Sequence, residues 1–504
     1  MTRISHLSRR RLLLGSATLG AVLGTGWETA ASARTHHRPR HSAAPSRDFD
    51  PVLADLHRRT FRWFWEVTPD ETGLTPDAST GPNFSSIAAV GFALTAYCIG
   101  VKSGYVTRPA AVARTLTTLR TLWNAPQGPE ITGVSGDKGF FYHFLHPDTA
   151  LRYDRCELST VDSSMLFLGA LTAAAFFDGP SADEAEIRKL GVALYERADW
   201  RFVAHDNGLV SMGWAPEPNL PDHNARGLID RNWDRYNEGM MVNLLALGSP
   251  THPAGDWNAW MATIGGTWGT NFGETYLGFS PMFGHQYSHV WFDFRGVADA
   301  FMRGHGIDYF INSARATRAQ RNYAIQNPGH FKDYGADVWG LTACRGPADV
   351  DLKVGGRTVS FHEYGARGPQ TGDKESFDDG TIAPTAGIGS IAFAPDISIP
   401  LVHSLRKKYG ADIYGDYGFL DAFNPTFPKT FETRTGHDTP HAGWVAKDYL
   451  GIDQGPILCM VENYRSGLVW DLFNRSAVTG SIVRRAFQTA DFRPVSTEGA
   501  WLKA

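Results

Sequence analysis

Two acidic residues stand where a loop enters an apolar segment. Glu157 lies between a cysteine and a leucine, shortly before the apolar stretch 161–177. Glu238 follows the run Trp-Asp-Arg-Tyr-Asn and precedes the apolar stretch 239–247. A carboxylate in apolar surroundings needs a partner or a chemical task, because its charge is costly to bury. Hydrolysis of an acetal uses one carboxyl group to protonate the leaving oxygen and a second to activate water or attack the anomeric carbon. The pair is therefore suited to glycoside hydrolysis.

Local helix signals place both acids at helix entrances. Ser159 and Asp162 form an S-x-x-D capping box, so a helix should begin just after Ser159, with Glu157 outside it on the loop. Asp234 could cap the second helix, which would put Glu238 in its first turn. Structural explanations exist too, since Asp162 can be a cap and Glu238 can complement the helix dipole. Burial beside aromatic rings would favour the protonated form of Glu238, as a proton donor requires.

The segment 284–295 carries histidine, glutamine, aspartate and arginine side chains at close spacing. If this whole segment were helical, His285, His289 and Asp293 would share one face and could bind a metal ion. Hydrogen bonds of His285, Gln286 and His289 to sugar hydroxyls, or a buried structural network, account for the same residues. We expect no metal and no cofactor.

Aromatic residues make up 12% of the chain, with 15 Trp. Many should pack in the core, but the C–H faces of a pyranose also lie flat on aromatic rings. Loops that mix aromatic and hydrogen-bonding side chains, such as 139–144, 378–384 and 449–456, are therefore candidates for sugar binding. The further substrate-binding candidates are Tyr142, His143, Trp214, Tyr236, Asp453 and Gln454.

The elements that must position these residues are mainly helical. Apolar periodicity predicts helices at about 87–99, 109–123, 161–177, 182–200, 239–247, 290–303, 309–325, 397–408 and 454–473. Asp50 and Pro51 are a plausible cap and first turn for a helix that opens the domain. Alternating apolar residues on both sides of Gly355-Gly356 predict one β-hairpin at 350–361. No break in composition divides residues 49–490, so we expect one all-α domain, which periodicity alone cannot assign to a helical toroid or another large α fold.

Composition and charge exclude several classes of protein. The chain of 504 residues is 42% hydrophobic, enough for a large core. Its net charge of −4, without a Lys/Arg stripe beyond the N-terminus, argues against a nucleic-acid partner. No phosphate-binding glycine motif supports nucleotide chemistry. The four cysteines are far apart, which predicts buried free thiols. We expect a monomer.

The N-terminus carries a targeting signal. Ser-Arg-Arg-Arg-Leu-Leu-Leu at 8–14 is a twin-arginine pattern, and Ala-Ser-Ala at 31–33 is a cleavage site. The apolar stretch between them is too short and too rich in glycine to span a bilayer. We therefore predict a signal peptide at 1–33, a flexible linker at 34–48, a catalytic domain at 49–490 and a secreted protein without a membrane span.

In combination, six motifs resemble the bacterial "glucoamylase-like" glycoside hydrolase family. That family includes endo-β-1,2-glucanases and, more distantly, the transglycosylating domain of cyclic β-1,2-glucan synthases. The resemblance covers about 49–470. Its motifs are SIAAVGF at 86–92, WNAPQG at 123–128, CELST at 156–160, YNE at 236–238, GHQYSH at 284–289 and GIDQGP at 451–456.

The resemblance implies an (α/α)6 toroid with a central cleft. It implies that Glu238 matches the general acid and Glu157 the opposing carboxylate, with Asp154 close enough in sequence to assist. It favours an endo-acting β-1,2-glucanase, for which we expect inversion of the anomeric centre. The alternatives are a transglycosylase or exo-acting glucosidase on the same scaffold, a non-catalytic glucan-binding protein, and a zinc hydrolase that uses His285 and His289.

Overall fold

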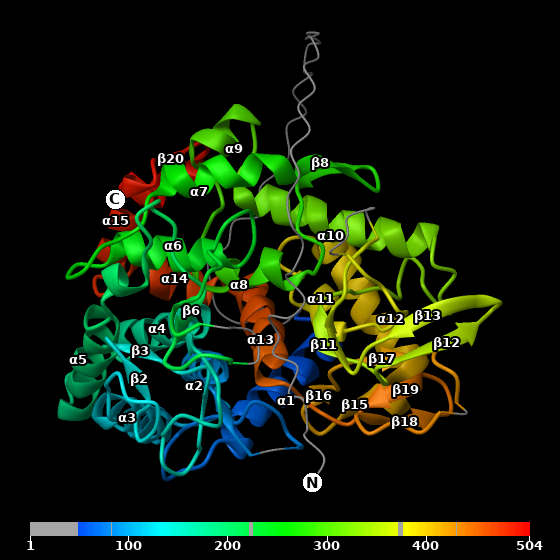
Figure 1. Cartoon of the computed structure of the whole chain (residues 1–504), viewed down its shortest axis with the longest axis horizontal. Coiled ribbons are helices and arrows are strands. Elements are labelled where there is room, and N and C mark those ends of the chain that lie inside the picture. The colour runs from blue at the N-terminus through cyan, green and yellow to red at the C-terminus, as the bar shows by residue number, and fades with distance from the viewer. Residues whose placement is uncertain (1–48, 82, 221–224, 371–375, 430, 504) are drawn as a thin grey trace.

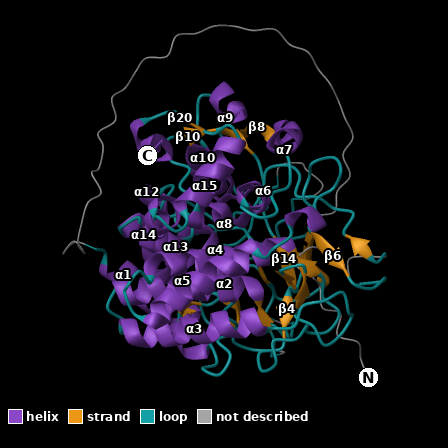
Figure 2. Cartoon of the chain, turned by 90° about the vertical axis from the view of Figure 1, so that its left-hand side faces the viewer, coloured by secondary structure: helices purple, strands orange, loops and turns teal. Residues whose placement is uncertain are grey.

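The computed structural model describes residues 49–81, 83–220, 225–370, 376–429 and 431–503 (Figure 1). The predicted signal peptide 1–33 and linker 34–48 lie outside the described residues. The described part is helix-rich, with sheets of only two or three strands. Figure 2 shows helices filling most of the molecule and strands lying towards its edges.

Helices that are buried on all sides lie at the centre of the molecule. Nearly every residue of these helices is buried, including the polar residues of α8 and α13. Helix α2 packs on α4 and α13, α4 on α6, α6 on α8, α8 on α13, and α11 on α13. The central helices are α2 (Ile87–Lys102), α4 (Thr160–Phe176), α6 (Gly239–Gly248), α8 (Phe283–Trp291), α11 (Pro384–Ile388) and α13 (Gly451–Arg465).

Helices that bury only part of their surface cover this central group. Helix α1 packs on α2 and α13, α3 on α2 and α5, α5 on α4, α15 on α6, α10 on α8, and α12 on α11. The remaining helices are α1 (Pro51–Val67), α3 (Arg108–Asn124), α5 (Ala182–Glu196), α7 (Trp257–Ile264), α9 (Ala300–Gly304), α10 (Tyr309–Gln326), α12 (Pro395–Ile413), α14 (Leu468–Arg475) and α15 (Gly480–Thr489).

Glycines let the central helices approach closely. A Cβ atom on Gly91 of α2 would lie 2.2 Å from the carbonyl oxygen of Met165 in α4. A Cβ atom on Gly169 of α4 would lie 2.0 Å from the carbonyl oxygen of Gly91. Both contacts are with backbone, which cannot move aside like a flexible side chain, so the α2–α4 contact requires glycine at both positions.

The predicted helix starts are confirmed at α1 and α4. The Asp50 carboxylate accepts hydrogen bonds from the backbone amides of Val52 (2.8 Å) and Leu53 (3.2 Å). The Ser159 hydroxyl accepts from the amide of Asp162 at 3.2 Å. These bonds satisfy amides that have no partner within the first turn of a helix.

Two predicted helices were wrong in extent. The helix expected at 290–303 does not form, because α8 ends at Trp291 and buried Asp293 turns instead to arginines outside the helix. The helix expected at 454–473 is divided at Gly467, whose φ of 72° lies in the left-handed region that interrupts a right-handed helix.

A strand-rich lobe lies beside α11 and α12, on the right of Figure 1. The hairpin of β12 (Val350–Val354) and β13 (Arg357–Phe361) confirms the prediction. The lobe also contains β11 (Ala343–Arg345), β14 (Tyr364–Ala366), β17 (Phe423–Asn424), β18 (Gly436–Thr439) and β19 (Gly443–Ala446), which were not predicted. It has a core of its own, which includes Phe331, Phe361, Phe427 and Trp444.

Short strands elsewhere pair the loops that join the helices. They are β1 (Ser85–Ser86), β2 (Gly136–Asp137), β3 (Phe140–Phe141), β4 (Phe144–Leu145), β5 (Leu158–Ser159), β6 (Gly213–Ala215), β7 (Gly227–Leu228), β8 (Trp268–Asn271), β9 (Glu274–Leu277), β10 (Val297–Ala298), β15 (Tyr414–Gly415), β16 (Gly418–Phe419) and β20 (Arg493–Pro494).

The four cysteines are buried and free, as predicted. Within the described ranges, no helix is both long and apolar enough to cross a membrane.

Candidate active site

The entrances of α4 and α6 are joined by a buried hydrogen bond. The indole Nε1 of Trp233 donates to the Thr160 hydroxyl at 2.8 Å. Thr160 is the first residue of α4, and Trp233 lies on the loop that leads to Glu238. On the other side of α6, the Ser288 hydroxyl of α8 donates to the Glu238 carbonyl oxygen at 3.2 Å. The two helices that follow the candidate acids therefore begin side by side.

The same kind of contact continues from α8 to α13. The Gln286 side-chain amide of α8 donates to the Ala386 carbonyl oxygen of α11 at 2.7 Å. The Thr385 hydroxyl of α11 donates to the Asp453 carbonyl oxygen, in the first turn of α13, at 2.8 Å. Gln286 and Asp453 thus help to hold the central helices together.

Backbone bonds continue from α13 through α2 and back to Glu157. The Gly451 amide, at the start of α13, donates to the Asp77 carbonyl oxygen at 2.8 Å. Asp77 lies on the loop that leads to α2, whose first amide, that of Ile87, donates to the His143 carbonyl oxygen at 3.2 Å. The His143 amide donates to the Glu157 carbonyl oxygen at 2.9 Å. Starts of central helices and the loops before them therefore meet in one region, which holds both candidate acids.

Glu157 precedes β5, the short strand that leads into α4. Its Oε1 lies 3.0 Å from Nδ1 of His143, and its side chain is 12% exposed. The second ring nitrogen of His143, Nε2, lies 3.6 Å from Oδ1 of Asp162, in the first turn of α4. The Ser159 hydroxyl contacts the other oxygen of Asp162. The histidine ring therefore lies between two carboxyl groups.

Glu238 is 6% exposed and occupies the N-cap position of α6. The helix begins at Gly239, so Glu238 lies just before its first turn, and Asp234 does not cap it and instead pairs with Arg235 at 3.4 Å. Glycine must follow Glu238, because a Cβ atom on Gly239 would lie 2.5 Å from the ring of Trp233. A carboxylate at this position faces the positive end of the helix dipole.

Three of the other predicted site residues lie around the loops of Glu157. Tyr142 is buried beneath the Arg152 guanidinium, which lies 4.7 Å from the ring centroid. Trp214 of β6 pairs with Leu158, the residue after Glu157. Asp154 is exposed and has a φ of 47°, in a turn before Glu157.

Tyr236, His285 and His289 are buried beneath the helix entrances. The Tyr236 ring stacks on Tyr309 with centroids 5.9 Å apart, and its hydroxyl lies 3.3 Å from that of Ser313. Burial lowers the pKa of His285 to about 3 and that of His289 to about 3, so both rings are neutral at ordinary pH. His285 Nε2 lies 3.1 Å from the Phe279 carbonyl oxygen. In the structure these rings belong to a packed network.

The structure does not assemble the metal face considered at 285–293. Asp293 lies beyond the end of α8 and pairs with Arg295 (2.8 Å) and Arg475 (2.7 Å). Within the described ranges, no three His, Cys, Asp or Glu side chains are grouped so that they could hold a metal ion.

Asp453 and Gln454 lie in the first turn of α13, with side chains 2% and 1% exposed. The Gln454 amide donates to the Phe419 carbonyl oxygen at 3.2 Å. The positions of all predicted site residues are therefore known, and their roles stay predictions.

A group of aromatic rings beside Glu157 was missed. The half-buried rings of Phe84 and Phe144 lie 4.6 Å apart, and that of Tyr153 lies 4.9 Å from Phe84. Phe144 also stacks on His143, with centroids 3.9 Å apart. The sequence makes segment 139–144 a candidate for sugar binding, but no spacing rule connects Phe84 with Tyr153.

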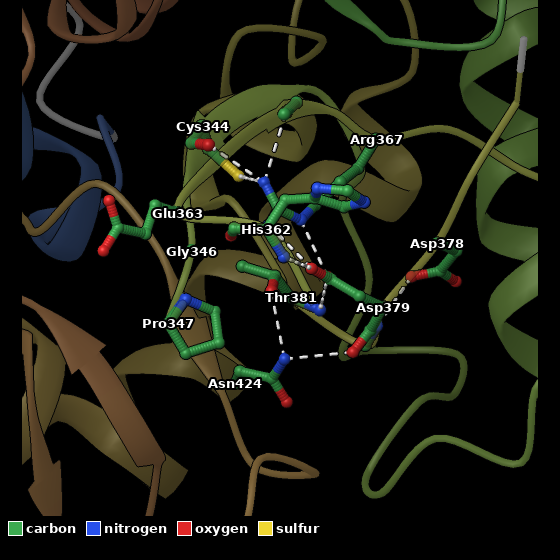
Figure 3. Close-up of polar contacts among 12 residues, drawn as sticks. Cys344, Gly346, Pro347, His362, Glu363, Arg367, Asp378, Asp379, Thr381 and Asn424 are labelled. Atoms are coloured by element: carbon green, nitrogen blue, oxygen red, sulfur yellow. Dashed lines mark hydrogen bonds and ion pairs between the residues drawn. The ribbon is translucent and has the colours of Figure 1, made fainter. Parts of the chain in front are cut away.

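A buried ion pair in the strand-rich lobe holds the loop that precedes α11 (Figure 3). Arg367 and Asp379 are both 0% exposed and form two hydrogen bonds of 2.7 Å. Burial works to raise the pKa of Asp379, but the Arg367 guanidinium outweighs it and holds that pKa below its usual value. The Asn424 side-chain amide donates to the Asp379 carbonyl oxygen at 3.1 Å. This network fixes the loop that leads into α11.

Comparison with known proteins gives one consistent family. The family model described as "Putative glucoamylase" matches residues 230–477. Over 456 residues the chain is 27% identical to an exo β-1,2-glucooligosaccharide sophorohydrolase (non-reducing end) of Parabacteroides distasonis. The match covers 84% of this chain and 56% of that relative, so the chain spans little more than half of the relative's length.

Solved structures agree. A Bacteroides uniformis protein described as a "putative glucoamylase" has 27% identity and a TM-score of 0.72, over 88% of this chain and 97% of that one. An endo-β-1,2-glucanase of Chitinophaga pinensis has 24% identity and a TM-score of 0.70, over 88% and 98%, which shows a shared fold. These comparisons support the bacterial glucoamylase-like family of glycoside hydrolases for this chain.

Proposed function

We propose that this protein hydrolyses β-1,2-glucan with two carboxyl groups at the entrance of an (α/α)6 toroid. The observation that carries the proposal is the placement of Glu157 and Glu238 at the starts of neighbouring central helices. The hydrogen bond from Trp233 to Thr160 joins the two entrances. The proposed inner ring of the toroid is α2, α4, α6, α8, α11 and α13.

In this proposal Glu238 donates the proton to the leaving oxygen. Its burial suits a group that must hold a proton, and it lies on the loop side of α6, where a substrate can approach. Glu157 works from the other side and activates water. An inverting enzyme needs room for that water, which corresponds to carboxyl groups about 6.5–9.5 Å apart. The product should then have the inverted anomeric configuration.

The relatives support β-1,2-linked glucose as the substrate. One is named an endo-β-1,2-glucanase and another a β-1,2-glucooligosaccharide sophorohydrolase. The rings of Phe84, Phe144 and Tyr153 offer a surface on which a sugar could stack beside Glu157. We favour endo cleavage. The name of the Parabacteroides relative makes exo release of a disaccharide the second candidate.

The test is digestion of β-1,2-, β-1,3- and α-1,4-glucans by purified protein, followed by chromatography and early NMR of the product anomer. Endo cleavage should shorten β-1,2-glucan rapidly, whereas exo cleavage should release sophorose from slowly shortening chains. Glu238→Gln should lower the rate by about 10²–10⁴-fold, the usual contribution of a general acid, and still bind oligosaccharide. A fully active Glu238→Gln protein would refute the assignment. A retained anomer would make Glu157 a nucleophile, and longer or cyclic products would indicate a transglycosylase.

Export by the twin-arginine pathway is part of the same proposal. Replacing Arg9 and Arg10 with lysine should leave the precursor inside the cell. Normal secretion of that double variant would contradict the assignment of residues 1–33.

A further inference from the structure

His143 is the side chain that connects Glu157 with the first turn of α4. Its ring is 3% exposed, so water contributes little to its solvation. Nδ1 lies 3.0 Å from Glu157 Oε1, and Nε2 lies 3.6 Å from Asp162 Oδ1. Carboxylates thus lie near both nitrogens of one buried ring.

A neutral imidazole fits this arrangement poorly. It carries one N–H and one lone pair, so the nitrogen without a proton would direct its lone pair towards a carboxylate. An imidazolium has a proton on each nitrogen and an opposite charge on each side. Opposite charges at this range attract each other, which favours the imidazolium form of the ring.

The neighbouring side chains of Arg152 and Cys156 do not disturb the charge balance among His143, Glu157 and Asp162. His143 lies between β3 and β4, and its backbone holds the start of α2 and the loop of Glu157. Arg152, which lies on the loop before Glu157, donates hydrogen bonds to the Glu217 carboxylate at 3.1 Å and to the Cys156 carbonyl oxygen at 2.8 Å. Burial and the neighbouring charge of Glu157 raise the pKa of the Cys156 thiol to about 12, so that thiol is uncharged.

We propose that His143 is a positioning residue, held as an imidazolium between Asp162 and Glu157, and that it keeps Glu157 ionised and oriented. Its consequence for catalysis rests on the proposed function. Water activation and nucleophilic attack both need Glu157 as a carboxylate, whereas Glu238 must keep its proton. The contact of His143 with Asp162 would therefore help to keep Glu157 in the charged state that its role needs.

Asp162 thereby has two tasks. Its amide and carboxylate complete the cap of α4 with Ser159, which is how the sequence explains it. The other carboxylate oxygen of Asp162 faces His143. This contact forms because the fold brings the loop of His143 next to α4, and the capping box does not predict that.

The direct test is the ¹⁵N spectrum of protein labelled at histidine. The chain has 18 His, so the signal of His143 is assigned by its loss in His143→Gln. At pH 7 the wild-type ring should show two protonated nitrogens. In Asp162→Asn the midpoint of its titration should fall by about one unit or more, as expected for loss of a nearby opposite charge. A neutral His143 in the wild-type protein at pH 7 would overturn the proposal, whatever the stability of Asp162→Asn.

The kinetic test uses Asp162→Asn with Asp137→Asn as its matched control. Asp137 is also buried, at 7% exposure, and its carboxylate contacts the backbone amide of Lys138 instead of a histidine. Asp162→Asn should lower kcat about tenfold or more with little change in KM, as when a group that orients a catalytic side chain is lost. The acid limb of its kcat/KM profile should move to higher pH. In Asp137→Asn, both kcat and the acid limb of the kcat/KM profile should stay as in the wild-type protein.

The two tests separate the two proposals. If the wild-type protein hydrolyses no glucan but His143 is an imidazolium, the positioning inference stands and the function fails. If the protein hydrolyses glucan and Asp162→Asn leaves the acid limb unmoved, the inference fails and the function stands.

Discussion

The central helices and the strand-rich lobe bury polar groups in different ways. Among the helices, His285 and His289 are neutral, and helix starts supply the positive end of a dipole where the candidate acids lie. In the lobe, Arg367 carries a full charge with no exposed surface. Its guanidinium donates to Asp379 and to the carbonyl oxygens of Cys344 (2.9 Å) and His362 (2.9 Å). A helix satisfies most of its own carbonyl groups, but short strands and loops do not, so a buried cation with five N–H donors can satisfy several of them at once in the lobe.

Removal of the lobe's cation should have the largest effect on stability. Arg367→Met leaves Asp379 as a buried charge without its ion-pair partner, which typically costs about 3–5 kcal/mol. The free energy of unfolding, measured by urea denaturation, should fall by that amount. Glucan hydrolysis should fall as well, because Asp379 lies on the loop that leads into α11.

The double variant Arg367→Met, Asp379→Leu is the matched control. It removes both charges, so it should be less damaging than Arg367→Met alone. The opposite ranking would show that the lobe depends on the five donors more than on charge balance.

The neutral histidines should make the central helices sensitive to acid. The folded-state pKa of His289 lies far below that of a free histidine, so the unfolded chain binds more protons below about pH 6.5. Stability should therefore decline as pH falls from 7 to 5, by about 2 kcal/mol for one such histidine. His289→Gln should reduce that decline, as measured by urea denaturation at both pH values. An unchanged decline would show that other groups cause the acid sensitivity.

Asp378 should give the lobe the opposite dependence. Burial, with the neighbouring Asp379 charge, raises its pKa to about 7, although hydrogen bonds from Gly380, Tyr334 and Tyr323 oppose the rise. The folded state then binds more protons than the unfolded chain between about pH 4 and 7, so this group's contribution to stability falls as pH rises. Between pH 5 and 7 the loss should be no more than about 2 kcal/mol.

Asp378→Asn tests that sign. The variant should be less sensitive to a rise from pH 5 to 7 than the wild-type protein, in the same denaturation experiment. If the free energy of unfolding of the variant changed with pH as it does in the wild-type protein, other buried acids would be responsible. One such acid is Asp448, whose pKa is raised to about 6 by burial.

The contrast also explains what could be predicted from the sequence. The central helices follow from apolar runs and caps, and both acids stand out in the sequence because each lies shortly before such a run. The lobe was predicted only at its hairpin, because its other strands are two to four residues long and some of them pair across the sequence, as Cys344 does with Gly365. A contact such as that of His143 with Asp162 depends on how the loops pack in three dimensions, and no local sequence pattern encodes that packing. The break after α8 was missed for the same reason, since the partner Arg475 of Asp293 lies far along the chain.

The smallest predicted effect lies at the tip of the hairpin. Gly355 and Gly356 join β12 to β13 with φ angles of 59° and 85°, and a Cβ atom on either would meet nothing within 4 Å. The cost of a side chain there is therefore conformational. Gly355→Ala should lower the free energy of unfolding by about 1 kcal/mol, because an L-residue is strained in the left-handed region. Gly355→Asn should cost less, since asparagine tolerates that region. Both variants should hydrolyse glucan like the wild-type protein, because the tip is not part of the site. Equal losses of stability for alanine and asparagine would point to a lost contact instead of strain, and a loss of activity would mean that the hairpin reaches the substrate.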